Sequence, residues 1–247
     1  MQKNGKRKYD CLVFDADHTL LDYVADERAA FLALYERIGI PPTEELLALS
    51  RRASEDAWTE AGMYDVHDTR VQERYHAVYR EHVREIFVRV FEKYPCPDPA
   101  VTPRLAGDMF LKNLENAGRA FAGAAETLAA LSRKTGGAYR VCIATNGLSA
   151  IQRGRLEPLK NYVEKTYISE EVGAIKPLPA FFERICAEQG VERSRCLMIG
   201  DSLSSDVAGA LAFGMDCCWY NPEKTANTTP FVPTYEISAL GELSEIL

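Results

Sequence analysis

The sequence lacks any long run of apolar residues. No stretch of its 247 residues approaches the ~18 to 20 consecutive apolar positions that a membrane-spanning helix needs. The first residues also lack an apolar signal core followed by a small-residue cleavage site. We therefore expect no membrane partner and a cytoplasmic location.

Cysteine pairs with metal-binding spacing are missing as well. The chain has seven cysteines, and none forms a Cys-x-x-Cys pair with matching histidines. Most lie in or beside apolar runs, where a thiol behaves as a small hydrophobic side chain. This pattern argues against structural zinc and fits a reducing cytoplasm. The cysteines in apolar surroundings are Cys11, Cys142, Cys196, Cys217 and Cys218.

The sequence also has no excess of positive charge. Its formal net charge is −7 at pH 7, which disfavours a nucleic-acid polymer or an anionic membrane as a partner. We find no internal repeat and no low-complexity segment. Nothing in the composition indicates an oligomeric state.

Two successive patterns divide the chain. Residues 24–117 repeat apolar positions at helical spacing and predict about four helices without a strand. From Ala122 onward, short apolar runs alternate with helical segments, which is typical of a parallel, doubly wound sheet. The expected fold is α/β, with a helical bundle inserted after the first strand. The expected domains are a core of residues 1–22 and 118–247, and a helical domain of residues 23–117.

The first apolar run, Cys11–Phe14, stops abruptly at two carboxylates and a hydroxyl, those of Asp15, Asp17 and Thr19. Alternate residues of an extended segment point the same way, so Asp15 and Asp17 can converge on one small volume. Two anions that close repel each other unless a cation or a shared proton separates them. The stretch therefore predicts a metal site or a proton-transfer site.

Later strands also end in polar side chains. The carboxyl ends of parallel strands share one edge of the sheet, where open α/β sheets bind ligands. A single aspartate at such a place is more often a helix cap or a turn residue. Capping does not explain why every strand end supplies a carboxylate, a hydroxyl or an ammonium group. The residues are Thr145 with Asn146, Lys176, and Asp201 with Asp206.

These strand ends resemble the four motifs of the haloacid dehalogenase superfamily, in the same order and spacing. The helical insert between the first two motifs resembles the helical cap of that superfamily. The resemblance implies a Rossmann-like core and a phosphatase that works through an aspartyl-phosphate. The matching segments are Asp15-Ala16-Asp17-His18-Thr19, Thr145-Asn146-Gly147, Lys176-Pro177 and the stretch from Gly200 to Asp206.

The resemblance assigns roles within the first motif. It makes Asp15 the nucleophile and Asp17 the general acid and base, which protonates the leaving oxygen and then deprotonates water. It also implies Mg2+, which prefers oxygen ligands. The expected protein ligands of the metal are Asp15, the backbone carbonyl of Asp17, and Asp201.

The other motifs are expected to serve the phosphate and its charge. Lys176 should supply positive charge, and Asp206 should orient Lys176 or a metal-bound water, with capping of the next helix as the alternative. Four ionised aspartates give −4 and Lys176 returns +1, so a phosphate dianion needs a divalent cation to enter. The residues expected to bind phosphoryl oxygens at a helix start are Thr145, Asn146 and Gly147.

Finer similarities point to the pyrimidine nucleotide 5′-nucleotidase subgroup, and so to nucleoside monophosphates as substrates. His18 departs from this subgroup, which usually has an aspartate there, and we interpret it as a hydrogen-bonded structural residue. The similar segments are Gln152 with Arg155-Leu156, Ile168–Gly173, Cys218-Trp219 and Pro233–Ile237.

Several readings of the substrate remain open. Asp17 favours phosphate esters over haloacids, because the dehalogenating branch of the superfamily lacks this residue. Trp58 and Arg74 are candidates for contacting a base, although Trp58 could equally belong to the core of the bundle. A sugar-phosphate or phosphoglycolate phosphatase and a phosphomutase are the alternatives. A non-enzymatic phosphate-binding protein is disfavoured, because the chain keeps Asp15, Asp17 and Lys176.

Overall fold

The computed structural model describes residues 7–247, which form two compact units. We call the first the sheet unit; it comprises residues 7–21, Ala120–Asn146 and Pro158–Leu247. We call the second the helical unit; it comprises Asp22–Arg119 and Gly147–Glu157. The short segment 147–157, which the sequence pattern grouped with the core, thus packs within the helical unit.

Six parallel strands form one sheet, in the order β3-β2-β1-β4-β5-β6. The chain adds β2 and β3 on one side of β1 and then returns to place β4 on the other side. The winding therefore reverses between β1 and β4, and ligands bind at the carboxyl edge of such a reversal. The predicted doubly wound sheet is confirmed. The strands are β1 (Cys11–Phe14), β2 (Arg140–Thr145), β3 (Lys165–Ile168), β4 (Cys196–Gly200), β5 (Asp216–Tyr220) and β6 (Tyr235–Ile237).

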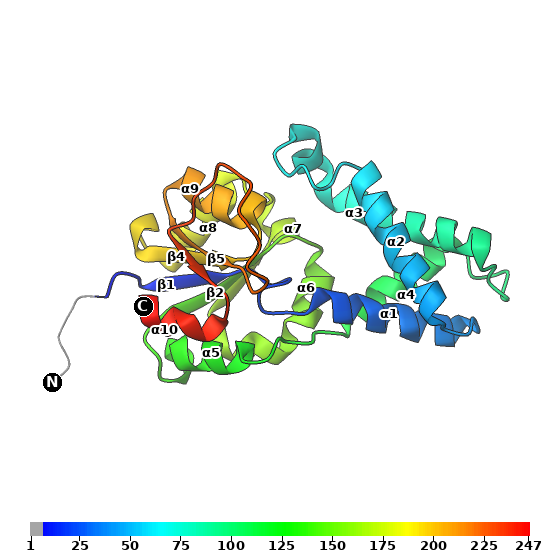
Figure 1. Ribbon diagram of the computed structural model, residues 1–247, viewed down its shortest axis with the longest axis horizontal. Coiled ribbons are helices and arrows are strands. Elements are labelled where there is room, and N and C mark those ends of the chain that lie inside the picture. Colours follow the sequence, from blue (N-terminus) through cyan, green and yellow to red (C-terminus); the bar gives the residue numbers. More distant parts are fainter. Residues whose placement is uncertain (1–6) are drawn as a thin grey trace. The chain divides into compact units, whose positions relative to one another are not determined.

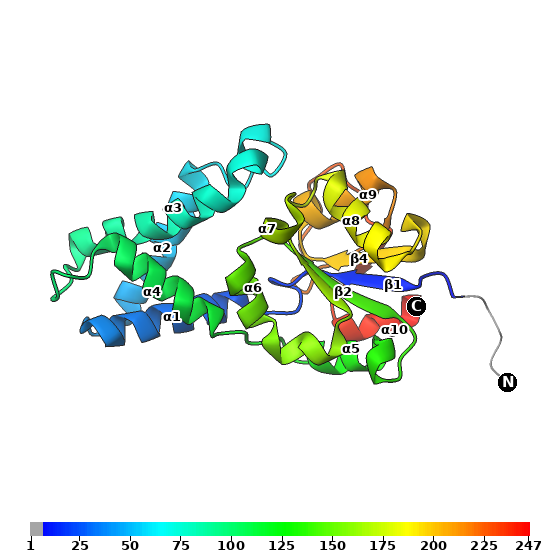
Figure 2. The same ribbon diagram turned by 180° about the vertical axis from the view of Figure 1, so that it is seen from behind.

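Helices cover both faces of this sheet, with α8 and α9 on one face and α5 and α10 on the other (Figures 1 and 2). All four side chains of β1 are completely buried, which is why this strand reads as a continuous apolar run. Phe181 and Phe182 of α8 pack on the same apolar cluster as Val13. The helices of the sheet unit are α5 (Ala124–Leu131), α7 (Ser169–Val172), α8 (Pro179–Gln189), α9 (Ala208–Phe213) and α10 (Leu243–Ile246).

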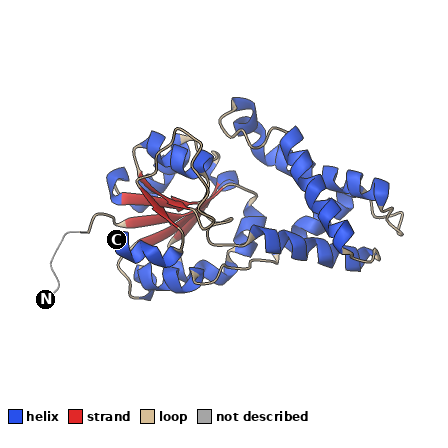
Figure 3. Cartoon of the chain, viewed as in Figure 1, coloured by secondary structure: helices blue, strands red, loops and turns tan. Residues whose placement is uncertain are grey.

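The described residues of the helical unit contain helices and no strand, as the sequence predicted for 24–117 (Figure 3). The long helices begin at a side chain that accepts a backbone N–H, and these are Asp22, Thr43, Asp68 and Thr102. A fifth, short helix packs against α4. The helices are α1 (Tyr23–Ile38), α2 (Glu44–Glu60), α3 (Thr69–Lys93), α4 (Pro103–Glu115) and α6 (Ser149–Arg155).

The core of the helical unit is built around three phenylalanine rings, one each from α1, α3 and α4. The ring centroids of Phe31 and Phe110 are 4.5 Å apart, and Phe87 lies 6.1 Å from Phe31 and 5.9 Å from Phe110. All three side chains are buried. No helix in the described part of the chain is long and apolar enough to cross a membrane.

Candidate active site

Three carboxylates gather where the winding of the sheet reverses. Asp15 directly follows β1, Asp201 directly follows β4, and Asp206 lies in the π-helical turn Leu203–Val207 that comes next. One carboxylate oxygen from each residue lies within 4.8 Å of the others. Such a set of oxygen donors fits a hard divalent cation such as Mg2+.

The ammonium group of Lys176 is embedded among these carboxylates. Its Nζ donates to Oδ1 of Asp15 at 2.6 Å, to Oδ1 of Asp206 at 2.7 Å, and to the backbone carbonyl of Ala144 at 2.7 Å. Lys176 is 2% exposed, so all three of its N–H donors are used inside the protein. These three hydrogen bonds hold the buried ammonium group of Lys176 beside the Asp15 carboxylate.

The pKa values of the groups at the carboxyl edge of the sheet reflect their burial and the crowding of like charges. Burial, reinforced by Asp206 and Asp201, raises the pKa of Asp15 against the opposing pull of Lys176. Burial and Asp206 also raise the pKa of Asp201, to about 6. Burial lowers the pKa of Lys176, but the two carboxylates outweigh it and the net shift is upward. The cluster therefore carries more negative charge than one lysine neutralises, and an added cation fits it.

Thr19 ties the first motif to the end of β4. Its hydroxyl donates to Oδ1 of Asp201 at 3.2 Å and accepts from the backbone N–H of Asp201 at 3.1 Å. The indole N–H of Trp219 donates to the backbone carbonyl of Asp201 at 2.9 Å. Both the side chain and the backbone of Asp201 are thereby held in place.

Asp206 is held by its neighbours as well as by Lys176. Its Oδ2 accepts from the backbone N–H of Ser202 at 3.2 Å. A Cβ atom on Gly200 would lie 2.2 Å from the same Oδ2, closer than any real contact. Glycine at position 200 is therefore required for the Asp206 carboxylate to lie against the backbone at the end of β4.

Asp17 and His18 occupy the turn after Asp15. Asp17 is partly buried, whereas His18 is exposed and has a φ of 62°. This left-handed backbone region is uncommon for a residue other than glycine, and His is among the side chains that tolerate it. The backbone N–H of His18 donates to the carbonyl of Leu21 at 2.9 Å and so closes the turn.

The second motif begins at the end of β2, next to β1. Thr145 is buried at the last position of the strand. The side chain of Asn146 makes two hydrogen bonds to the backbone of Lys176: Nδ2 donates to its carbonyl at 2.9 Å, and Oδ1 accepts from its N–H at 2.8 Å. Asn146 thus positions the loop that carries Lys176. Gly147 is buried and is the first residue of the segment that belongs to the helical unit.

A buried ion pair that sequence reasoning missed lies inside the helical unit. Asp26 of α1 is 2% exposed and Arg155 of α6 is 1% exposed. Oδ2 of Asp26 accepts from Nε of Arg155 at 2.9 Å, and Oδ1 accepts the backbone N–H groups of Gly118 and Arg119 at 3.1 and 2.9 Å. The available signal was a charged residue on the apolar stripe of α1, one turn before Ala30.

The two candidates for base contact lie on different helices of the helical unit. Trp58 of α2 is partly buried, and its ring meets those of Tyr75, Tyr79 and His82 edge to face. Arg74 is exposed on α3. The structure does not bring Arg74 into the aromatic group around Trp58.

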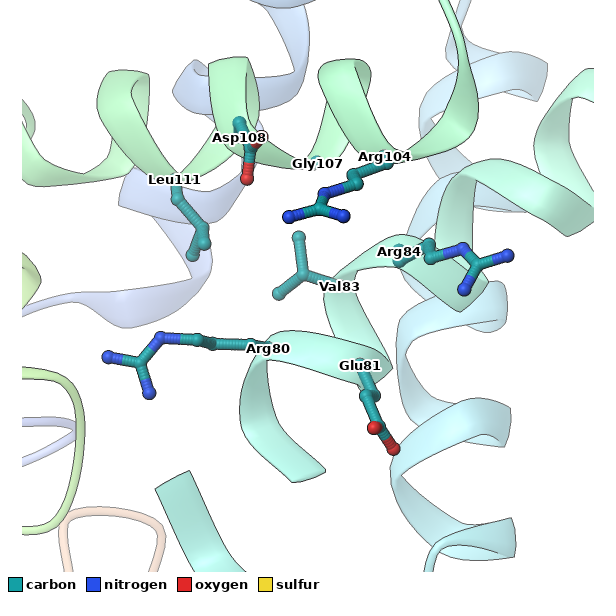
Figure 4. Close-up of a pocket in the computed structure, with 8 residues that line it drawn as sticks. All are labelled: Arg80, Glu81, Val83, Arg84, Arg104, Gly107, Asp108 and Leu111. Atoms are coloured by element: carbon teal, nitrogen blue, oxygen red, sulfur yellow. The ribbon is translucent and has the colours of Figure 1, made fainter. Parts of the chain in front are cut away.

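A cavity of about 400 Å³ opens on the helical unit between α3 and α4 (Figure 4). Among the residues that line it, the side chain of Arg104 lies over Val83, and Asp108 projects from the same helix as Arg104. None of the residues proposed above for chemistry or base contact lines it. The lining residues are Arg80, Glu81, Val83, Arg84, Arg104, Gly107, Asp108 and Leu111.

Comparison with known proteins identifies the family of the chain. A family model for haloacid dehalogenase-like hydrolases matches residues 9–214. The HAD-hydrolase YfnB of Bacillus subtilis is 29% identical over 246 residues, which cover 98% of this chain and 96% of YfnB. The crystal structure of YfnB bound to magnesium has a TM-score of 0.80 and covers 98% of this chain and 99% of that chain.

Two further relatives are pyrimidine 5′-nucleotidases. PynA of Streptococcus pneumoniae is 30% identical over 242 residues, which cover 97% of this chain and 95% of PynA. YjjG of Escherichia coli is 39% identical over 114 residues, which cover 45% of this chain and 51% of YjjG. The family model covers most of the chain, and its residues include every strand-end side chain described above. The chain therefore belongs to the haloacid dehalogenase-like hydrolase family.

Proposed function

We propose that this hydrolase removes the phosphate from nucleoside 5′-monophosphates, with Mg2+ as cofactor and an aspartyl-phosphate as intermediate. The family and the relatives named as pyrimidine 5′-nucleotidases place the chain among phosphoric monoester hydrolases. The observation that carries the proposal is the contact of Lys176 Nζ with Asp15 at the reversal of the sheet. It sets a cation beside a carboxylate at the place where this fold binds ligands.

In the proposed mechanism, a carboxylate oxygen of Asp15 attacks phosphorus in line with the leaving 5′-oxygen of the nucleoside. Asp17 donates a proton to that oxygen, so the nucleoside leaves as a neutral alcohol. Water then attacks the phosphorus of the aspartyl-phosphate while Asp17 takes its proton. Inorganic phosphate leaves, and both carboxylates return to their starting state.

The remaining residues hold charge and position. The hydrogen bond from Lys176 fixes the orientation of one oxygen of Asp15. The positive charge of Lys176 also offsets negative charge on the phosphoryl group. Thr145 and the backbone amides of Asn146 and Gly147 bind the phosphoryl oxygens. Asp15, Asp201 and the backbone carbonyl of Asp17 would hold Mg2+, which supplies neutralising charge to the phosphate when bound.

A panel of phosphate esters tests the substrate. With Mg2+ present, we expect kcat/KM for uridine, cytidine and thymidine 5′-monophosphates to exceed that for ribose 5-phosphate, glucose 6-phosphate and phosphoglycolate by at least tenfold. Released inorganic phosphate is the readout. Faster turnover of the sugar phosphates or of phosphoglycolate would replace the nucleotidase proposal by one of those activities.

A further inference from the structure

Two residues of the segment after the second motif, Gln152 and Arg155, have no role in the chemistry proposed above. Both lie on the short helix α6, and both are buried, with exposed fractions of 3% and 1%. Glutamine and arginine side chains are rarely buried unless their polar atoms have partners. The contacts of these two side chains lead from α1 to Gly147, the residue that directly follows Asn146.

The series of contacts begins at Asp26 on α1, whose carboxylate is held by the two backbone N–H groups described above. Its Oδ2 accepts from Nε of Arg155 at 2.9 Å and lies 2.9 Å from Nη2 of the same guanidinium. The guanidinium carbon of Arg155 also lies 5.1 Å from the centroid of the Tyr23 ring. These contacts restrain the planar guanidinium group in one orientation.

Arg155 in turn orients the amide group of Gln152. Nη1 of Arg155 donates to Oε1 of Gln152 at 3.1 Å. Because arginine offers only donors, the amide atom that faces it is the oxygen, and Nε2 of Gln152 is directed away from the guanidinium. A Cβ atom on Gly147 would lie 3.2 Å from Cγ and 3.3 Å from Nε2 of Gln152. The Gln152 side chain therefore packs against the open face of Gly147.

The backbone of Gly147 has a conformation that favours glycine. Its φ is 151°, which residues with a side chain rarely adopt. The N–H of Gly147 belongs to the peptide plane that it shares with Asn146. Asn146 is anchored by its two hydrogen bonds to the backbone of Lys176. This peptide plane is thus restrained from both ends, by Lys176 through Asn146 and by α6 through Gly147.

We propose that Gln152 and Arg155 are positioning residues for phosphate binding, because they hold the N–H of Gly147 in the direction that a phosphoryl oxygen requires. This assignment rests on the proposed function, in which that amide binds the phosphoryl group. A backbone amide that is already oriented loses less conformational freedom when it binds the anion. Neither side chain touches the substrate in this assignment, and the base plays no part. Their effect is therefore the same for every phosphate ester.

Inhibition of p-nitrophenyl phosphate hydrolysis by inorganic phosphate measures this restraint. Gln152→Ala removes the contact with Gly147, and should raise the Ki of phosphate at least fivefold. It should lower kcat/KM at least tenfold, by the same factor within twofold for p-nitrophenyl phosphate and uridine 5′-monophosphate. Gln152→Met fills the same space but replaces the amide by a thioether, a poor acceptor for Arg155, and should raise Ki at least threefold. Gln72→Ala, which removes a hydrogen bond to the carbonyl of Val66 in the same unit, is the matched control and should leave Ki unchanged.

The outcomes separate this inference from the function on which it rests. A wild-type enzyme that hydrolyses p-nitrophenyl phosphate but no nucleotide would disprove the nucleotidase, and the Ki values would still decide the roles of Gln152 and Arg155. A wild-type Ki in both Gln152 variants would overturn the inference even if their melting temperatures fell, because a purely structural role lowers stability without changing phosphate affinity. A wild-type Ki in Gln152→Met alone would overturn the role of Arg155.

Two further results are decisive. A loss of kcat/KM confined to uridine 5′-monophosphate would contradict the inference, because it would assign Gln152 to the base rather than to the phosphate. If Gln152→Ala does not fold, the Ki of Gln152→Met decides, since this variant preserves the packed volume of α6.

Discussion

At the scale of single residues, the site depends on a carboxylate held beside one buried ammonium group. Asp15 is 7% exposed, and its Oδ1 accepts from Lys176 at 2.6 Å. This contact fixes the orientation of one carboxylate oxygen, and in the proposed mechanism the other oxygen attacks phosphorus. Replacing the carboxylate by an amide keeps the shape of the side chain but removes the nucleophile of the proposed mechanism.

Asp15→Asn should therefore reduce turnover of every phosphate ester by roughly a thousandfold or more, because an amide does not form the aspartyl-phosphate. Steady-state release of phosphate in Mg2+ measures the loss. Asp98→Asn, in an exposed turn, serves as the control. A variant that kept near-native rates with a native unfolding curve would disprove nucleophilic catalysis by Asp15.

His82 should make the stability of the protein depend on pH. Burial lowers its pKa to about 4, aided by the cation of Arg89, whereas the unfolded chain has a value of about 6.5. The unfolded state then binds the proton more readily, so the stabilising contribution is present above pH 6.5 and is lost as the pH falls toward 4. The wild type should lose about 2 kcal/mol more unfolding free energy than His82→Gln between pH 7.5 and 4.5.

Urea unfolding at the two pH values measures this difference. His67→Gln, which changes an exposed histidine, should follow the wild type. Identical pH dependence in the wild type and His82→Gln would show that His82 titrates normally in the folded protein.

At the scale of elements, the short helix α6 is joined to α1 by the buried pair of Asp26 and Arg155. α6 starts two residues after Gly147, so the pair lies at the far end of the helix that follows the second motif. Two glycines let the backbones approach. A Cβ on Gly154 would lie 2.1 Å from the carbonyl of Glu115, and one on Gly118 would lie 2.3 Å from the carbonyl of Arg155.

Breaking this pair should be costly. Asp26→Asn leaves the Arg155 guanidinium buried without its counter-charge, and we expect a loss of about 3 kcal/mol in unfolding free energy. Denaturant titration measures it. Glu44→Gln removes the exposed pair with Arg28 and should leave stability nearly unchanged. If the two substitutions had equal effects, the buried pair would not hold α6 in place.

At the scale of the whole molecule, binding of a divalent cation should both support activity and stabilise the folded protein. The gathered carboxylates of Asp15, Asp201 and Asp206 repel one another in the folded state, and an ion that binds only the folded state stabilises it. Mg2+ at 100 times its Kd should add about 2.7 kcal/mol to the free energy of unfolding. EDTA should abolish turnover and reverse the gain.

Thermal unfolding with and without Mg2+ checks this prediction. Asp201→Asn should shrink the stabilisation, whereas Asp108→Asn, on α4 in the helical unit, should leave it intact. Turnover that persisted in EDTA, or a melting temperature unaffected by Mg2+, would argue against a metal bound by Asp15 and Asp201.

The sequence by itself determined the local features of this protein, because they depend on neighbouring residues. The continuous apolar run of β1, the capping side chain of Asp22, and Pro179 with Gly190 at the ends of α8 all lie within one element. The parallel sheet followed from the alternation of strands and helices. That topology in turn placed Asp15 and Asp201 at one edge.

Only the tertiary structure decided which distant groups meet. Lys176 contacts both Asp15 and Asp206, 161 and 30 positions away, and the carbonyl of Ala144 completes its hydrogen bonds. Likewise, Glu27 and Ser54 stand 27 positions apart and Ser54 and His82 stand 28 apart. Helical periodicity shows that a polar residue lies on a buried stripe, but the packing of three helices selects its partner. That selection depends on side-chain shape and burial across the unit, which no local pattern encodes.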